Sequence, residues 1–286
     1  MQVTKQNINE ENNSNEKISQ DNSSPEFGGV KESLAVYNRD NFKPVILYED
    51  DYCLVINKPA GIMAHPDLKS TAYTISDWMG DNYPESSKID EVRPGIVHRL
   101  DRDTSGCMLL VKDPGEYNKY KTQFQDHSIK KVYLAIVSGL IKLDTGVIDT
   151  PIARAKSDFR KKEVKNEFTK DYRGELREAL TRYKVIERIG HGVNSFSLIE
   201  CLPMTGRTHQ IRVHLRSIRH PILGDQLYGS RESVAQAPRQ MLHAKSLEFT
   251  SFKRNDTGEK VKVKIKVEAP IPADMAETLE KIKKMC

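Results

Sequence analysis

The sequence predicts an α+β fold: a single domain on a twisted, mostly antiparallel mixed β-sheet that is flanked by helices and loops. Short segments with alternating apolar side chains recur along the chain and are joined by short turns, as in antiparallel sheets. Fewer segments have apolar side chains at helical spacing. The first 44 residues, by contrast, show almost no apolar periodicity. Together these observations favour one mixed domain that follows a polar tail.

Residues 1–44 are rich in Asn, Ser, Gln and Glu. Such a segment cannot bury enough apolar surface to offset the entropy lost on ordering, so we predict that it is disordered. The folded domain is then expected over residues 45–286. The tail has five basic and seven acidic side chains (net −2), whereas the remainder has 40 basic and 33 acidic side chains (net +7). A surplus of that size is compatible with a polyanionic partner.

Strands are predicted where short apolar runs alternate with polar residues or lie between turn residues. The first two, 45–48 and 52–56, surround the turn 49–51. In 131–139 the alternation places Tyr133 on the face opposite the bulkier apolar side chains. Further strands are predicted over 107–111, over 180–189 paired with 195–202, and over 261–267.

Helices are predicted where apolar side chains recur at helical spacing. This applies to residues 116–127 and to the segment from 211 to 218, for which Thr208 is the expected N-cap. A short helix is predicted over 74–79. The chain ends in an amphipathic helix whose inward side chains are Met275, Leu279 and Ile282.

Residues 154–173 form an irregular, basic segment in which lysines and arginines alternate with aromatic residues. We expect a loop here. Basic side chains interleaved with aromatic ones occur both on solvated loops and on surfaces that contact a polyanion. The composition leaves both interpretations open.

The four cysteines occur singly, without the spacing of metal ligands. Cys53, Cys107 and Cys201 lie in apolar runs, so we predict buried free thiols, as in a reducing compartment. No apolar run approaches the roughly 20 residues that span a bilayer, and the amino terminus lacks the features of a signal peptide. We therefore expect a cytoplasmic protein that does not interact with membranes.

The stretch from Val97 to Gly106 combines two arginines, a histidine, two carboxylates and two hydroxyls between apolar segments. Burying polar groups at this density costs little free energy only if they form hydrogen bonds or ion pairs with one another. A polar turn whose side chains cap backbone groups would explain it. A reactive loop held by a rigid scaffold is the alternative explanation.

Residues 98–106, His-Arg-Leu-Asp-Arg-Asp-Thr-Ser-Gly, resemble the signature of the RluA family of RNA pseudouridine synthases. Residues 131–139 resemble the tyrosine strand of that family, and residues 205–215 its arginine motif. The resemblance covers roughly 45–270 in the family's order. The flanking segments 58–61, 221–225, 227–229 and 242–244 also fit the family pattern.

The resemblance implies an enzyme that isomerises specific uridines to pseudouridine in structured RNA, in a cleft across the middle of the domain. Large-subunit ribosomal RNA is the first expected target and transfer RNA the second. The implied catalytic residues are Asp101, which acts at the ribose, Tyr133, which stacks on the base, and Arg212, which pairs with the carboxylate. The resemblance implies neither a cofactor nor a metal, and we expect a monomer.

The resemblance also implies contacts to RNA. Arg99 is similar to the family arginine that fills the space left by the flipped nucleotide. For His98, Thr104 and Ser105 we expect either a scaffolding role or contacts to phosphate. The remaining predicted RNA-binding residues lie in the arginine motif: Arg207, His209 and Gln210.

Two other classes of function stay open. Asp101 and Asp103 are the carboxylate pair that a glycosidase or a magnesium-dependent nuclease would use, and a chelator would then abolish activity. Alternatively the chain is an RNA-binding or ribosome-assembly factor without essential catalysis. In that case an Asp101→Asn protein would retain its cellular function.

Overall fold

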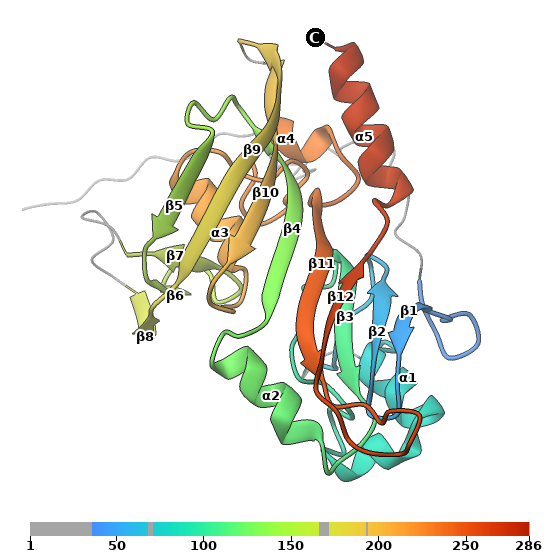
Figure 1. The fold of residues 1–286 in the computed structure, drawn as a ribbon. Coiled ribbons are helices and arrows are strands. Elements are labelled where there is room, and N and C mark those ends of the chain that lie inside the picture. Colours follow the sequence, from blue (N-terminus) through green and yellow to red (C-terminus); the bar gives the residue numbers. More distant parts are fainter. Residues whose placement is uncertain (1–35, 68–70, 166–171, 193, 286) are drawn as a thin grey trace, which may run out of the picture. The chain divides into compact units, whose positions relative to one another are not determined.

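The computed structural model describes residues 36–67, 71–165, 172–192 and 194–285 (Figure 1). Residues 1–35 of the predicted tail and Cys286 lie outside the described residues. Residues 36–44, however, pack against the domain: Phe42 is only 2% exposed, and its ring centroid lies 6.2 Å from that of Trp78 and 5.4 Å from that of Tyr37. The packed part of the chain therefore begins before the predicted boundary at residue 45.

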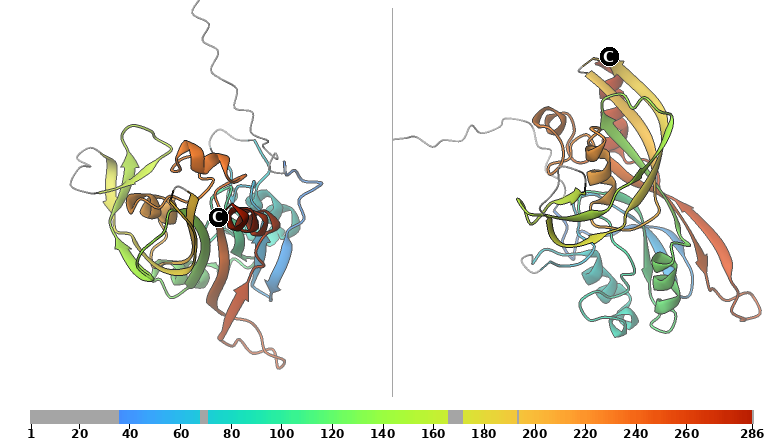
Figure 2. Two further views of the ribbon diagram at one scale, coloured as in Figure 1. Left: turned by 90° about the horizontal axis from the view of Figure 1, so that it is seen from above. Right: turned by 90° about the vertical axis from the view of Figure 1, so that its left-hand side faces the viewer.

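A nine-stranded sheet forms the centre of the domain, in the order β1-β2-β3-β11-β4-β10-β9-β5, with β12 paired to β11. Every pair is antiparallel except β3 with β11. The two views of Figure 2 show its twist, and the predicted fold class is confirmed. The strands are β1 (Val45–Glu49), β2 (Cys53–Lys58), β3 (Ser105–Val111), β4 (Lys130–Ser138), β5 (Thr145–Asp149), β9 (Leu180–His191), β10 (Asn194–Pro203), β11 (Leu242–Ser251) and β12 (Val263–Glu268).

A second sheet has three strands in the order β7-β6-β8: β7 (Lys162–Val164), β6 (Ile152–Ala155) and β8 (Tyr172–Arg177). It occupies the basic segment for which we expected a loop, so that prediction was wrong. These strands are short and rich in charged residues, and they show no apolar alternation. The sheet is held instead by tertiary packing, because Ile152 and Val164 join a buried cluster with Val213 and Tyr228.

The helices are α1 (Ile75–Asn82), the 3₁₀ turn η1 (Pro84–Lys88), α2 (Tyr117–Gln125), α3 (Gln210–Ser217), α4 (Arg231–Ala235) and α5 (Ala273–Lys284). Thr74 caps α1 through a reciprocal pair of hydrogen bonds with Asp77. The prediction of Thr208 as the N-cap of α3 was wrong. His209 occupies that position in the left-handed conformation, with φ of 58°, and makes no side-chain cap.

The apolar core is divided among clusters on both halves of the large sheet. One cluster joins β4, β9 and β10 to α3 and α5, and there Met275 and Ile282 are buried as predicted. Two others cover β2 and β3, one of them beneath α1. The three described cysteines are buried free thiols, also as predicted. Among the described residues, no helix is long and apolar enough to cross a membrane.

The parallel contact between β3 and β11 positions the polar loop that precedes β3. Gly106 pairs with Ala244 there, with a φ of 110°, and an added Cβ would overlap the Ala244 carbonyl group. Only glycine permits this approach. Because Ala244 is also the register partner of Tyr133 in β4, the glycine brings the polar loop close to the tyrosine strand.

Candidate active site

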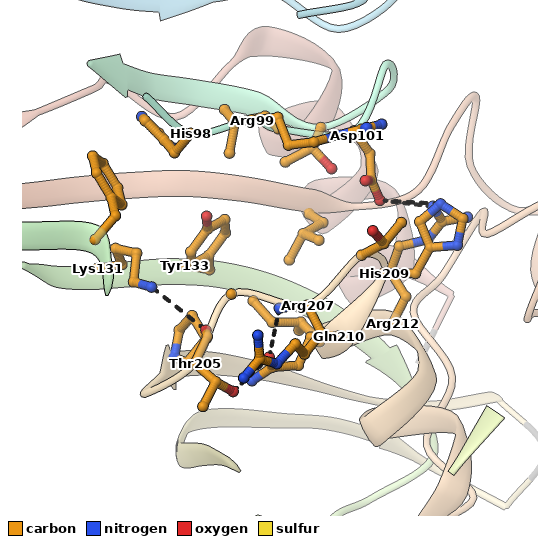
Figure 3. A pocket seen from close by; sticks show the side chains of 18 of the residues that line it. His98, Arg99, Asp101, Lys131, Tyr133, Thr205, Arg207, His209, Gln210 and Arg212 are labelled. Atoms are coloured by element: carbon orange, nitrogen blue, oxygen red, sulfur yellow. Dashed lines mark hydrogen bonds and ion pairs between the residues drawn. The ribbon is translucent and has the colours of Figure 1, made fainter. Parts of the chain in front are cut away.

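A cavity of about 530 Å³ opens between the polar loop, β4 and the segment that leads into α3. Figure 3 shows Asp101 and its neighbours on one wall and the residues around Arg207 on another, with Tyr133 between them. Every predicted site residue except Ser105 lines this cavity. Residues separated by about 100 positions in the sequence therefore meet at one site.

Arg212 joins two carboxylates at the inner end of the cavity. Its Nη1 donates to Asp101 Oδ2 at 2.7 Å, while its Nε and Nη2 donate to the two oxygens of Asp225 at 2.7 and 2.9 Å. Asp225 is fully buried and also accepts the backbone N–H groups of Leu227 and Tyr228. The guanidinium is thus held in one orientation, with one edge directed at Asp101.

Asp101 is ionised in this arrangement. Burial alone raises the pKa of a carboxyl group, but the Arg212 guanidinium outweighs burial and holds the pKa of Asp101 below its ordinary value. The pKa of Arg212 is lowered by burial and raised by its carboxylate partners, with a net rise. The side chain of Asp101 keeps 18% of its surface exposed to the cavity, against 6% for Arg212. The carboxylate is therefore the member of the pair that substrate can reach.

His209 lies beside the same carboxylate, with Nε2 at 3.9 Å from Asp101 Oδ2. Its Nδ1 is 3.0 Å from the hydroxyl oxygen of Tyr228, which also accepts the backbone N–H of Lys162. Burial lowers the pKa of His209 although Asp101 opposes this shift. The left-handed backbone of His209, costly for a non-glycine residue, directs its ring toward Asp101.

Tyr133 forms the floor of the cavity on β4, between its register partners Cys201 on β10 and Ala244 on β11. Its ring packs against two of the apolar clusters. Burial, and secondarily the Asp101 charge, raise the pKa of its phenol. The side chain is therefore a neutral aromatic surface at the predicted position for a base.

The structure gives His98 and Arg99 different surroundings. The His98 ring stacks on Phe124, with centroids 4.3 Å apart, and its Nε2 accepts the backbone N–H of Leu109 at 2.9 Å. Burial lowers the pKa of His98 to about 3, so the ring is neutral. Arg99 is exposed at the cavity, and its Nη1 lies 3.2 Å from Nε2 of His65. Of the two, only Arg99 presents a charge to an incoming anion.

Thr104 and Ser105 are enclosed by the protein. The Thr104 hydroxyl accepts a hydrogen bond from Gln240 at 2.7 Å. The Ser105 hydroxyl lies 3.0 Å from Nδ1 of His243 and accepts a hydrogen bond from Arg239. Ser105 is 3% exposed and lies outside the cavity lining. These contacts favour the scaffolding alternative for both residues.

Two buried basic side chains, Lys58 and Arg239, donate hydrogen bonds to backbone carbonyl groups of the polar loop. Lys58 Nζ donates to the carbonyl oxygen of Arg102 at 2.9 Å, and Arg239 Nη1 donates to that of Asp103 at 3.0 Å. Arg239 is in turn fixed by Asp274 at the start of α5. Burial lowers the pKa of Lys58 to about 7. Successive carbonyl groups of the loop are thus tied to separate parts of the domain.

Gln210 and Arg207 organise the turn into α3. Gln210 is buried and accepts from the Thr205 hydroxyl and from the backbone N–H of Arg207. Its amide donates to the Leu180 carbonyl and the Thr181 hydroxyl. All of these bonds lie within the protein, so Gln210 shapes the wall, while Arg207 lies at the cavity edge.

The contacts of Asp103 argue against a carboxylate pair made with Asp101. Asp103 binds the side chain of Arg102 at 2.9 and 3.2 Å, and Asp101 binds Arg212. Each carboxylate is therefore neutralised by its own arginine. Among the described residues, no group of three or more His, Cys, Asp or Glu side chains is arranged to hold a metal ion.

No role was predicted from the sequence for Asp225, Lys131 or Arg239. Lys131 lines the cavity, and burial lowers its pKa to about 8. Asp225 follows an apolar run as part of a Gly-Asp pair, a signal too common to indicate an anchoring carboxylate. Arg239 precedes β11 and carries no recognisable pattern. Their roles follow from tertiary contacts.

Residues 51–217 match the RNA pseudouridylate synthase family. The chain is 39% identical over 240 residues to an uncharacterized RNA pseudouridine synthase of Bacillus subtilis (strain 168), over 84% of this chain and 73% of that protein. It is 38% identical over 245 residues to ribosomal large subunit pseudouridine synthase D of Neisseria meningitidis serogroup A, over 82% of this chain and 60% of that protein.

A solved structure, human RNA pseudouridylate synthase domain containing 1, has the same fold, with a TM-score of 0.60 at 23% identity, over 84% of this chain and 95% of that one. The family match, the two relatives and the fold agree with the resemblance seen in the polar loop and the arginine motif. The chain therefore belongs to the RNA pseudouridine synthases, enzymes that isomerise uridine to pseudouridine in RNA.

Proposed function

We propose that this synthase modifies one or a few uridines of large-subunit ribosomal RNA, and that the Asp101 carboxylate acts at the ribose of a flipped-out uridine. The observation that carries the proposal is the pair between Asp101 and Arg212, with Nη1 and Oδ2 2.7 Å apart in an open cavity. It provides an ionised carboxylate that a nucleotide can reach.

The reaction itself needs such a group. The C1′–N1 bond of uridine breaks, the freed uracil turns, and its C5 bonds to the same C1′. C5 then loses its proton, and N1 gains one. A carboxylate acts here either as a nucleophile at C1′ or as a base at the 2′ position, and both roles need it ionised. Arg212 meets that requirement by lowering the pKa of Asp101.

Two further residues serve the base and the vacated position. Tyr133 offers a neutral ring on which uracil stacks while it turns. Arg99 is exposed at the cavity and extends into the space that the flipped nucleotide leaves in the RNA. Unstacking a base costs a few kcal/mol, and both contacts help to offset that cost.

The choice of RNA rests on the relatives named ribosomal large subunit pseudouridine synthase D; transfer RNA is the second candidate. We further propose a monomer that acts in the cytoplasm without a metal or cofactor. The buried free thiols Cys53, Cys107 and Cys201 fit a reducing compartment. The isomerisation transfers no electrons to or from a second substrate.

The test maps pseudouridine across total RNA from cells with and without the protein, using a carbodiimide reagent that marks the modified base. We expect one or a few discrete sites in large-subunit RNA to disappear, and to return with the wild-type chain but not with Asp101→Asn. Loss of sites only in transfer RNA would overturn the proposed target. Restoration by Asp101→Asn would overturn the proposed role of the carboxylate.

A further inference from the structure

A second cavity of about 310 Å³ lies on the three-stranded sheet, next to the active-site cavity. The two cavities share the segment from Gly206 to Thr208, so Arg207 lines both. Figure 1 shows β6, β7 and β8 beside α3, the helix that carries Arg212. The two cavities therefore adjoin along this shared segment.

The charged side chains that line this second cavity are mostly positive. Its lining has five cationic side chains and a single carboxylate, that of Glu175. Glu175 is 3.5 Å from Arg177, and both side chains are largely exposed. The cationic side chains are Arg154, Lys162, Arg173, Arg177 and Arg207.

Three of these cations lie next to one another on adjacent strands of the three-stranded sheet. Arg154 on the central strand β6 is the register partner of Lys162 on β7 and of Arg173 on β8. Like charges on directly opposite residues destabilise a sheet, and no described carboxylate pairs with these three side chains. Burial and the charges of Arg154 and Arg177 lower the pKa of Lys162. This row of like charges therefore does not stabilise the three-stranded sheet.

The row is also connected to the reacting centre. The backbone N–H of Lys162 donates to the Tyr228 hydroxyl at 2.7 Å, and that oxygen lies 3.0 Å from Nδ1 of His209. The Nε of Arg207 donates to the Glu178 carbonyl at 2.9 Å, which fixes this arginine at the border of the two cavities. The first contact links Lys162 of the row to the active-site wall, and the second holds Arg207 between the two cavities.

We propose that this basic groove binds the phosphate backbone of the RNA strand next to the target uridine. Among the described residues, its lining has one carboxylate and no aromatic ring, which favours recognition of phosphates rather than bases. The inference rests on the proposed RNA substrate and deepens it, because it identifies a second contact region outside the catalytic cavity. Binding energy gained there helps to hold the flipped nucleotide in the first cavity.

The test replaces the row by the triple variant Arg154→Gln, Lys162→Gln, Arg173→Gln in the full chain. A matched control removes three exposed cations elsewhere: Lys264→Gln, Lys281→Gln, Lys284→Gln. The dissociation constant for an oligouridylate of about 20 nucleotides is measured over a range of salt concentrations. Each lost phosphate contact reduces the slope of log K against log salt by about 0.7 for a single strand.

For the triple variant, called the groove variant, we expect the slope of log K against log salt to be smaller in magnitude by about 2. Its dissociation constant should be at least about tenfold higher than that of wild type. The control variant should stay close to wild type in both quantities. The melting temperature of the groove variant should equal or exceed that of wild type, because a like-charge row is removed. Equal slopes for the groove variant and the control would overturn the proposal.

Turnover is measured separately, on the RNA site that the mapping identifies. With enzyme in saturating excess, the groove variant should isomerise at the wild-type rate, while its half-saturating concentration rises. A slower rate at saturation would overturn a purely binding role. If the wild-type protein binds oligouridylate but modifies no ribosomal site, the proposed target fails, and the salt slopes still decide the groove.

Discussion

Asp225 fixes the orientation of the Arg212 guanidinium through two parallel hydrogen bonds, Nε to Oδ2 at 2.7 Å and Nη2 to Oδ1 at 2.9 Å. This geometry leaves Nη1 directed at Asp101. Arg212 thus serves two carboxylates of different character, one fully buried and fixed by backbone N–H groups, the other open to the cavity. The buried carboxylate sets the direction, and the open one is free to react.

Asp225→Asn should therefore reduce turnover without touching the cavity. The Asn amide keeps one oxygen for Arg212 Nη2 and the backbone N–H groups of Leu227 and Tyr228, but its NH₂ group takes the place of Oδ2 and cannot accept from Arg212 Nε. We expect kcat to fall by about 10²-fold, the cost typical of a small misplacement, and the acid limb of the pH profile to move upward. Asp144→Asn, which removes a solvent-exposed partner of Arg188, is the control. An unchanged pH profile in Asp225→Asn would show that Asp225 does not act through Asp101.

Arg212→Met should abolish activity and destabilise the fold. It leaves Asp225 buried without a counter-charge, at a cost of about 3–5 kcal/mol in the free energy of unfolding. Burial would then raise the pKa of Asp101 without the opposing charge and hydrogen bond of Arg212. Arg212→Lys keeps the charge but cannot bind both carboxylates in parallel, so we expect intermediate stability. Denaturant unfolding and single-turnover rates check both variants, and full activity of Arg212→Met would remove Arg212 from the mechanism.

RNA binding should weaken as the pH rises through about 8. Burial lowers the pKa of Lys131 in the cavity to about 8, so its ammonium group is charged below that pH and neutral above it. A neutral amine attracts phosphate less. Dissociation constants measured between about pH 6.5 and 8.8 should rise for wild type. They should stay level for Lys131→Arg, because an arginine keeps its charge. Parallel profiles for the two proteins would show that Lys131 does not contact RNA.

The sequence predicted seven of the nine strands of the large sheet, because apolar runs and short turns mark them, whereas β5 and β11 were not predicted. The pairing of β9 with β10 and the inward face of α5 were predicted as well. The small sheet was not predicted, because strands of only three to six residues with interspersed charges carry no periodic signal. Their pairing depends on packing against Val213 and Tyr228, which lie far along the chain.

The functional site, too, could be predicted from the sequence only in part. The polar loop and the arginine motif predicted the cavity wall, because each is a continuous run of residues. Asp225 and Arg239 were not assigned roles, since their partners are brought to them only by the fold. Ser105 is the opposite case, because it was predicted to belong to the site. It lies in the polar loop that resembles the family signature, yet its hydroxyl is enclosed by His243 and Arg239. Membership of a motif does not tell which side chains face the substrate.

The central claim is that the Asp101 carboxylate performs the isomerisation. Transcribed large-subunit RNA that carries the mapped uridine is labelled with tritium on uridine C5, and tritium release is followed with purified wild type, Asp101→Asn and Asp103→Asn. Asp103 lies in the same loop and binds Arg102 instead. We predict that Asp101→Asn falls below about 1% of the wild-type rate while binding RNA and melting as wild type does, and that Asp103→Asn stays active. Tritium release by Asp101→Asn at the wild-type rate would contradict the account.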